Sequence, residues 1–447
     1  MAQSVLLTEG NIRKQILAFS WPVFLSMIFS ELYNITNSMI VGNYVSLKAL
    51  SAVSACTWIC NVFNYTFYGL GMGAGILVAR YYGAGDMNNL KKSLDTSVIF
   101  AFVGGIGLTV ISELFLPFLM KLCNIGPDLY QDALAYLRVY LIGNTAVLTS
   151  QMCFFILRSF GDTKHQFYYS VISSIVNIVL GLILVRLLHL NVIGTAIATI
   201  ISQFVTDYLA LQLMFHYDGI NFDIRNLDFS LKVVAEICAL GIPAGFQNML
   251  IAISSMMVQS FINRFSNEVI AGIGVAEKVG NWAQLASVSV SGATMSMVAQ
   301  NMGAEKYERV RESIKESAII SSFFTVLSIL IVMTLAPWLV GRFNDSPEVI
   351  YYGTQMIRFS NFSMFFVSLS HIYNGANRGA GNVRIPMYIA IFSQCLCKYL
   401  FVWIGLKLFY DVHVLYLGTA FGFVMAGLLA TFYFYRSRWT LEHQLRK

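Results

Sequence analysis

The chain has 447 residues, of which 57% are hydrophobic and only 12% are charged, and its mean hydropathy is +0.66. An ordinary soluble domain carries about a quarter charged residues, so a water-soluble fold is excluded and the excess apolar surface must face lipid. The net charge of +6 does not indicate nucleic-acid binding, because the Lys and Arg residues follow the loops of a membrane topology.

Twelve apolar segments are each long enough to cross a bilayer, which takes about 20 largely apolar residues. In chain order they are 15–42, 47–78, 93–118, 130–157, 165–186, 191–215, 232–262, 268–298, 314–341, 349–376, 384–409 and 413–435. The loops between them are short and leave no room for a soluble catalytic domain. No nucleotide loop, metal cluster or nucleophile motif stands in a suitable context, so we expect neither an enzyme nor a bound metal.

The positive charges predict the orientation of the chain in the membrane. With the N-terminus placed inside, the inner segments hold 19 Lys and Arg residues and the outer loops hold six. Inner loops of membrane proteins carry such an excess. We therefore expect a multi-pass protein of the cytoplasmic (inner) membrane with both termini in the cytoplasm.

The second half of the chain repeats the first at an offset of about 220 residues. The aligned pairs include Gly83 with Gly303, Ala84 with Ala304, Pro117 with Pro337, Arg158 with Arg378, Gly161 with Gly381 and, with a slip of one, Pro22 with Pro243. Each repeat holds six segments, so both halves enter the membrane from the same side. We predict an all-α integral membrane protein with six-helix lobes at 1–217 and 232–447, a cytoplasmic linker at 218–231, and a pseudo-two-fold axis along the membrane normal.

One polar stripe lies in the first segment. Glu31 is its only acid in the middle of the membrane, and Asn34 and Ser38 follow on the same helical face. Asn37 lies about 120° away from Glu31 around the helix and is not part of this stripe. Because an ionisable group in hydrocarbon is costly, Glu31 is a candidate for binding a coupling cation. A carboxylate capped by neighbouring donors is the alternative.

A second polar face recurs in both halves and predicts a shared central cavity. In segment 268–298 it comprises Glu277, Asn281 and Gln284, and in segment 47–78 it comprises Asn61, Asn64, Tyr65 and Tyr68. Glu277 is a second acidic candidate for cation coupling. The other six residues, together with Asn34 of the first segment, are candidates for lining a substrate cavity. Amide-mediated helix packing is the alternative.

Several short motifs stand in a fixed order along the chain. They are Ser20-Trp21-Pro22, Leu32-Tyr33-Asn34-Ile35, Ile40-Val41-Gly42, Ala79-Arg80-Tyr81-Tyr82-Gly83-Ala84-Gly85, Arg158-Ser159-Phe160-Gly161-Asp162-Thr163, Gly241-Ile242-Pro243-Ala244-Gly245 and Ala299-Gln300-Asn301-Met302-Gly303-Ala304. In order and spacing they resemble the multidrug and toxic compound extrusion (MATE) transporters. The resemblance implies alternating access between two six-helix lobes, and export of organic cations against an inward flow of Na⁺ or H⁺ with no cofactor.

Three carboxylates that the family usually carries are missing from this sequence. The family aspartate of the first segment falls at Asn37, the acid four residues after Asn177 is replaced by Gly181, and the acid after Gly241-Ile242-Pro243 falls near Ile251. Asn37 and Asn177 remain as possible oxygen ligands. The candidates for cation coupling are therefore Glu31, Glu277, Asn37 and Asn177.

The expected partners are small amphipathic cations and the lipid bilayer. We expect a monomer that does not bind nucleic acid. Relatives in the wider superfamily flip lipid-linked oligosaccharides, so a flippase for these or another amphipathic substrate is the alternative function.

Overall fold

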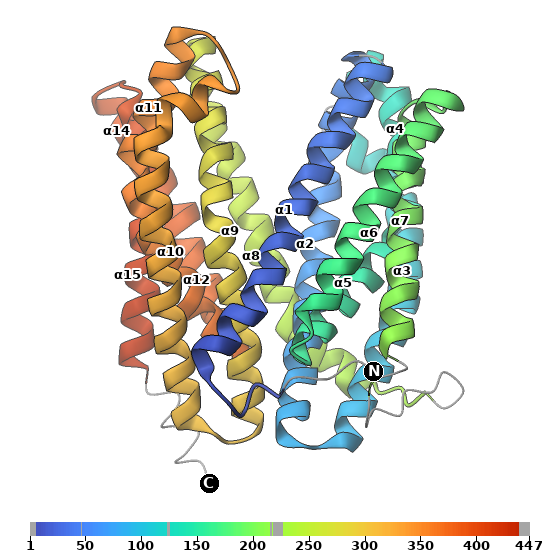
Figure 1. Cartoon of the computed structure of the whole chain (residues 1–447). Coiled ribbons are helices and arrows are strands. Elements are labelled where there is room, and N and C mark those ends of the chain that lie inside the picture. Colours follow the sequence, from blue (N-terminus) through green and yellow to red (C-terminus); the bar gives the residue numbers. More distant parts are fainter. Residues whose placement is uncertain (1–5, 46, 123–125, 215–216, 218–226, 438–447) are drawn as a thin grey trace. The chain divides into compact units, whose positions relative to one another are not determined.

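The computed structural model describes residues 6–45, 47–122, 126–214, 217 and 227–437, and most of them are helical (Figure 1). The first half contains α1 (Ile12–Tyr44), α2 (Leu47–Ala84), α3 (Met87–Leu122), α4 (Pro127–Ile142), α5 (Asn144–Ser159), α6 (Thr163–Leu182), the π-helical turn η1 (Ile183–Leu187) and α7 (Asn191–Met214). The second half contains α8 (Leu231–Ile262), α9 (Asn267–Gly303), α10 (Tyr307–Gly341), α11 (Pro347–Ser360), the 3₁₀ turn η3 (Asn361–Ser363), α12 (Met364–Gly379), α13 (Arg384–Ala390), the π-helical turn η4 (Ile391–Cys397), α14 (Lys398–Leu408) and α15 (His413–Arg436). Each of the twelve predicted segments is present as one helix or as a run of consecutive helices.

Most of these helices are long enough and apolar enough to span a membrane. Nine spans in the described residues meet both conditions, with α6–η1 and α13–η4–α14 each counted as one, and α4 with α5 forms a tenth span as a bent pair. The remaining two predicted spans are α9, whose sequence includes charged and amide residues, and the run α11–η3–α12, whose two helices have 14 and 16 residues. The prediction of an all-α integral membrane protein is confirmed.

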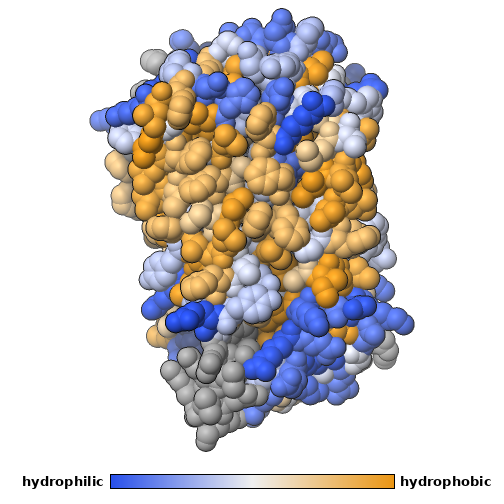
Figure 2. All heavy atoms as spheres, turned by 90° about the vertical axis from the view of Figure 1, so that its left-hand side faces the viewer, coloured by the Kyte–Doolittle hydropathy of each residue, from blue (hydrophilic) through white to orange (hydrophobic). Residues whose placement is uncertain are grey.

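A hydrophobic band lies between two hydrophilic ends on the face of the molecule shown in Figure 2. Large apolar side chains are exposed along the helices of the second half, among them Phe323, Leu330 and Trp338 of α10 and Phe421 and Phe432 of α15. Water would strongly disfavour so continuous an apolar surface. The band is the surface that lipid covers in a membrane protein.

The predicted span 130–157 is not one straight helix. The chain bends by 48° between α4 and α5, at Gly143. A Cβ atom at Gly143 would lie 2.6 Å from Ile200 Cγ1 of α7, so the missing side chain permits a close approach of α7 at the bend. Neither a proline nor a polar run marks this position, which is why the apolar pattern predicted a single segment.

The chain forms two compact units whose boundaries differ from the predicted lobes. Unit 1 comprises Met1–Leu7 and Trp21–Gly245, and unit 2 comprises Thr8–Ser20 and Phe246–Lys447. The start of α1 therefore packs with the second half of the chain, and the start of α8 packs with the first half. In both cases the rest of the helix lies in the other unit.

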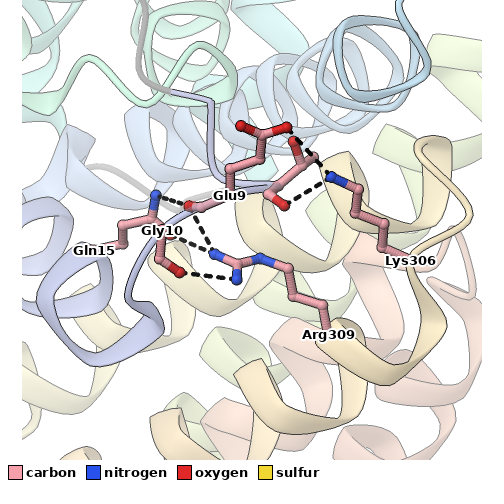
Figure 3. A network of polar contacts seen from close by, with 6 residues as sticks. Glu9, Gly10, Gln15, Lys306 and Arg309 are labelled. Carbon is pink, nitrogen blue, oxygen red and sulfur yellow. Dashed lines mark hydrogen bonds and ion pairs between the residues drawn. The ribbon is translucent and has the colours of Figure 1, made fainter.

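Arg309 of α10 holds the start of α1 in unit 2 (Figure 3). Its guanidinium donates hydrogen bonds of 2.9 Å to the carbonyl oxygens of Glu9 and Gly10. It also donates to Gln15 Oε1 at 2.9 Å. Hydrogen bonds from a charged donor are roughly twice as strong as neutral ones. These bonds give a physical reason why the segment before Pro22 belongs to unit 2.

Two further contacts of α10 reinforce this attachment. Lys306 Nζ donates to the carbonyl oxygen of Thr8 at 3.0 Å. The Arg13 guanidinium pairs with the Glu316 carboxylate, and its Nη2 lies 3.1 Å from Glu316 Oε1. All of these groups belong to unit 2.

Glycines let the start of α8 pack closely against α2 in unit 1. A Cβ atom at Gly69 would lie 2.4 Å from the carbonyl oxygen of Gly241 and 2.6 Å from the nitrogen of Gly245. A Cβ atom at Gly73 would lie 2.4 Å from the carbonyl oxygen of Ile237. The two helices thus meet through Gly69-x-x-x-Gly73 and Gly241-x-x-x-Gly245, the spacing with which membrane helices bring their backbones together.

The predicted linker at 218–231 falls partly outside the described residues, since 218–226 are not described. Its last residues are held by α3, because Asp95 Oδ2 accepts a hydrogen bond of 3.1 Å from the amide of Asp228. Thr96 Oγ1 accepts another of 3.1 Å from the amide of Ser230. The described end of the linker therefore belongs structurally to unit 1.

Candidate ion-binding and substrate site

Four polar side chains of unit 1 meet at the hydroxyl group of Tyr33 on α1. Tyr33 Oη lies 3.0 Å from Thr199 Oγ1 on α7. Asn177 on α6 is fully buried, and its Nδ2 lies 3.3 Å from Thr199 Oγ1 and 3.5 Å from Tyr33 Oη. Asn37, one turn after Tyr33, also forms a hydrogen bond with the Tyr33 hydroxyl. The structure therefore brings together two of the predicted coupling residues, Asn37 and Asn177.

A second polar group adjoins this one through two tyrosines of α4. Asn64 Nδ2 on α2 donates to Tyr140 Oη at 3.2 Å, and the ring of Tyr140 stacks on that of Tyr136 with centroids 5.8 Å apart. Both tyrosines are close enough to Tyr33 to interact with it electrostatically. We call the combined set the Tyr33 cluster, and its members are Tyr33, Asn37, Asn64, Tyr136, Tyr140, Asn177 and Thr199.

Two oxygen atoms of the Tyr33 cluster have unmet hydrogen-bonding capacity. Asn37 Oδ1 and Asn177 Oδ1 are buried, and neither accepts a hydrogen bond from the described residues. Leaving a buried acceptor unsatisfied costs about 1–3 kcal/mol. A small hard cation prefers oxygen ligands and suits unsatisfied acceptors of this kind. The cluster contains no carboxylate, so its chemistry suits a metal cation better than a proton.

The Glu31 stripe is present on α1 and is exposed. Glu31, Asn34 and Ser38 all lie on the accessible surface of the helix. The Ser38 hydroxyl donates to the carbonyl oxygen of Asn34 at 3.0 Å and not to Glu31. Within the described part of the chain the Glu31 carboxylate has no hydrogen-bond or ion-pair partner, so the neighbouring side chains do not cap it. Its role in coupling remains a prediction.

Glu277 on α9 lies in unit 2 and has a charged neighbour. Glu277 and Asn281 are exposed, and Gln284 is half-buried. Lys398, at the start of α14, is 8% exposed and interacts electrostatically with Glu277. This lysine partly compensates the charge of Glu277, whereas no described residue does so for Glu31. Of the two predicted acids, Glu31 is therefore the freer to bind a cation.

The four substrate-cavity candidates on α2 differ in their side-chain contacts. All four are half-buried. Asn64 belongs to the Tyr33 cluster, and the Tyr68 ring contacts the Phe155 ring edge-on with centroids 5.1 Å apart. Asn61 and Tyr65 stay predicted cavity residues, as do Asn281 and Gln284 on α9.

A family model named MatE matches this chain twice, at residues 22–183 and at residues 243–404. The chain belongs to the MatE family. The two matches begin at Pro22 and Pro243, which are aligned in the internal repeat. The MatE unit thus occurs once in each half of the chain.

Known MatE relatives match almost the whole chain. Probable multidrug resistance protein YpnP of Bacillus subtilis is 24% identical over 437 residues, which cover 97% of each chain. Multidrug export protein MepA of Staphylococcus aureus strain N315 is 25% identical over 398 residues, covering 87% of this chain and 86% of MepA. A solved structure described as MATE in the bent conformation has a TM-score of 0.92 at 20% identity and covers 100% of both chains. These likenesses show the MatE fold of twelve membrane helices in two lobes.

Sequence reasoning missed four members of the Tyr33 cluster. They are Tyr33, Tyr136, Tyr140 and Thr199. Tyr33 and Thr199 contact the predicted Asn177, Tyr140 contacts the predicted Asn64, and Tyr136 stacks on Tyr140. For Thr199 a signal exists in the sequence, because hydroxyl residues recur along one face of α7. They are Thr195, Thr199, Ser202 and Thr206. No comparable sequence pattern marks Tyr136 and Tyr140, whose place in the cluster depends on the packing of α4 against α2.

Proposed function

We propose that this MatE protein exports amphipathic organic cations in exchange for Na⁺ or H⁺, by alternating access between its two units. The observation that supports this most directly is the double MatE match, together with full-length relatives named as multidrug resistance or export proteins. Antiport requires that the ion and the drug compete for a protein group. The exposed carboxylate of Glu31 and the unsatisfied oxygens of the Tyr33 cluster are the groups that suit this role in unit 1.

The two candidate groups favour different ions. The Tyr33 cluster offers neutral oxygen atoms, which bind Na⁺ but do not carry a proton. The Glu31 carboxylate binds either a proton or a cation. Coupling through Asn37 and Asn177 therefore means Na⁺ exchange, and coupling through Glu31, with Glu277 as a second candidate, permits proton exchange.

Ethidium efflux from proteoliposomes tests the proposed function. A Na⁺ gradient and a proton gradient are imposed separately, so that each ion is measured without the other. We expect efflux under at least one inward gradient and none without a gradient. A protein that leaves ethidium in place under both gradients, but moves a lipid-linked oligosaccharide between leaflets, would be a flippase instead.

Cysteine labelling checks the proposed orientation, with both termini in the cytoplasm. In a background without the seven native cysteines, Lys121→Cys and Arg342→Cys are expected to react with a membrane-impermeant maleimide added to intact cells. Asn88→Cys and Glu305→Cys are expected to react only after the cells are opened. These four positions are exposed, so accessibility differs only by the side of the membrane. Labelling of Asn88→Cys or Glu305→Cys in intact cells would contradict the orientation.

Binding of Na⁺ to the Tyr33 cluster is tested by thermal unfolding of the purified protein. If Asn177 Oδ1 is a ligand, Na⁺ raises the melting temperature relative to K⁺ or choline, because an ion that binds only the folded state stabilises it. Asn177→Ala is expected to remove this Na⁺-specific rise. Ser173→Ala on the same helix, whose hydroxyl bonds to the carbonyl oxygen of Ser202, serves as the matched control and is expected to keep it. An unchanged Na⁺ response in Asn177→Ala would exclude this ligand.

A further inference from the structure

A buried acidic group lies in the membrane part of unit 1, away from the Tyr33 cluster. Asp207 lies on α7 and is 4% exposed. It follows Thr199 by two helical turns, which places the two residues about 12 Å apart along the helix axis. None of the Tyr33 cluster residues contacts Asp207 in the described structure, so this carboxyl group is a separate feature of the unit.

Among the described residues, Asp207 has one hydrogen-bond partner and no cationic partner. The Ser150 hydroxyl on α5 donates to Asp207 Oδ1 at 2.5 Å, while Oδ2 is buried and has no partner among the described residues. The nearby ionisable group is the Cys153 thiol, also on α5. The other elements packed against α7 include α1, α2, α4, α6 and η1, and in the described residues none of them brings an ionisable side chain into contact with Asp207.

The apolar surroundings of Asp207 determine whether its carboxyl group is charged. An ionised carboxylate without a cation or several donors costs many kcal/mol in an apolar interior, and such a group takes up a proton instead. A neutral carboxyl group at the same place leaves one unmet polar group, which costs far less than an unpaired buried charge. The neutral form of Asp207 therefore has the lower free energy in the packed structure. It can keep the short hydrogen bond with Ser150.

We propose that Asp207 is a proton-binding site, loaded with a proton in the packed arrangement of α5 and α7 and emptied when water reaches it between these helices. Loading joins one proton from water to the carboxylate and gives a neutral carboxyl group, and emptying returns that proton to water. The ionised form needs hydration that the packed helices exclude. Release of the proton is thereby coupled to separation of α5 from α7.

In transport, this site supplies a proton-dependent step that the neutral Tyr33 cluster lacks. This consequence rests on the proposed antiport, whereas proton binding by Asp207 does not. A group that is protonated in one arrangement and ionised in another biases the equilibrium between the two with pH. Asp207 would thus favour the packed arrangement at low pH and the hydrated one at high pH.

Infrared difference spectroscopy of the full-length protein in nanodiscs measures the proton directly. The carbonyl band of a protonated carboxyl group should be present at acidic pH and should fade as the pH is raised. Asp207→Asn should lack this component, because its amide carries no titrating proton. Glu31→Gln is the matched control and should retain it. An identical pH-dependent band in Asp207→Asn would overturn the proposal, as would an Asp207 band that never changes with pH, since that is a purely structural carboxyl group.

Transport provides the second readout. Asp207→Asn resembles the loaded form, so we expect efflux driven by a proton gradient to fall about tenfold or more. Exchange of internal for external ethidium, which needs no net proton movement, should continue. Wild-type rates of gradient-driven efflux in Asp207→Asn would overturn the role in coupling. If the wild type itself exports no organic cation, the proposed function fails, while the spectroscopic result still decides whether Asp207 binds a proton.

A second variant keeps the experiment interpretable if Asp207→Asn does not fold. Asp207→Glu retains the acid and should keep a titrating carboxyl band at a shifted frequency. Ser150→Ala removes the hydrogen bond but leaves the carboxyl group, and it should change the pH at which the band fades without abolishing the band. Loss of the band in Ser150→Ala with a normal melting temperature would contradict its assignment to Asp207.

Discussion

Glu31→Gln is expected to reduce gradient-driven efflux of organic cations by about two orders of magnitude, the upper end of ordinary coupling energies. The amide keeps the size and polarity of the side chain but binds neither a proton nor a cation through charge. Glu31 is exposed on α1 without a partner among the described residues, so its carboxylate is available to either ligand. Expression and drug binding should stay measurable, because no packing contact is removed.

Glu277→Gln is the matched comparison for Glu31→Gln. Its charge is already compensated in part by Lys398, so the loss of efflux should be smaller. Efflux from proteoliposomes under separate Na⁺ and proton gradients gives both values. Wild-type rates in both variants would exclude the acids from coupling. Efflux that survives in Glu31→Gln and depends only on Na⁺ would assign coupling to Asn37 and Asn177.

Gly69→Ala is expected to lower the free energy of unfolding of the protein by about 3 kcal/mol, the upper range for overpacking. The added methyl group would lie 2.4 Å from the carbonyl oxygen of Gly241 and 2.6 Å from the nitrogen of Gly245. Both neighbours are backbone atoms, so no side chain can rotate away. The change therefore forces α2 and α8 apart at their closest approach.

Gly107→Ala is the control for the effect of alanine in a helix. A Cβ atom at Gly107 of α3 meets nothing within 4 Å, and alanine favours a helix over glycine by up to about 1 kcal/mol. Its melting temperature, measured by intrinsic fluorescence in detergent, should equal or exceed that of the wild type. A melting temperature of Gly69→Ala equal to that of Gly107→Ala would show that the two helices do not pack through these glycines.

The helices and the duplication were predictable because they depend on local properties of the sequence. Runs of about 20 apolar residues identify spanning helices without knowledge of their neighbours, and pairs such as Pro22 and Pro243 reveal the repeat. The bend at Gly143 was not predictable, because its cause is the approach of Ile200 from another helix. The assignment of the start of α1 to unit 2 depends on hydrogen bonds from Arg309, nearly 300 residues later in the chain.

The candidate site was only partly predictable for the same reason. Asn37 and Asn177 were identified through the positions of the missing family carboxylates, and the structure joins them through Tyr33. Thr199 completes the group from α7, although nothing in its own neighbourhood distinguishes it from the other hydroxyl residues of that helix. Asp207 was visible as an acid in an apolar segment, but its lack of a cationic partner becomes apparent only when α5 and α7 are packed together.

The exchange of helix ends between the units bears on how the protein arose. In each repeat the first helix begins in one unit and ends in the other, at Thr8–Ser20 for α1 and before Phe246 for α8. A single ancestral repeat with this architecture could not complete its own core, since the start of its first helix would need a second copy to receive it. Two such repeats would exchange equivalent ends, as the identical chains of a domain-swapped homodimer do. Gene fusion would then have joined two subunits that already depended on each other.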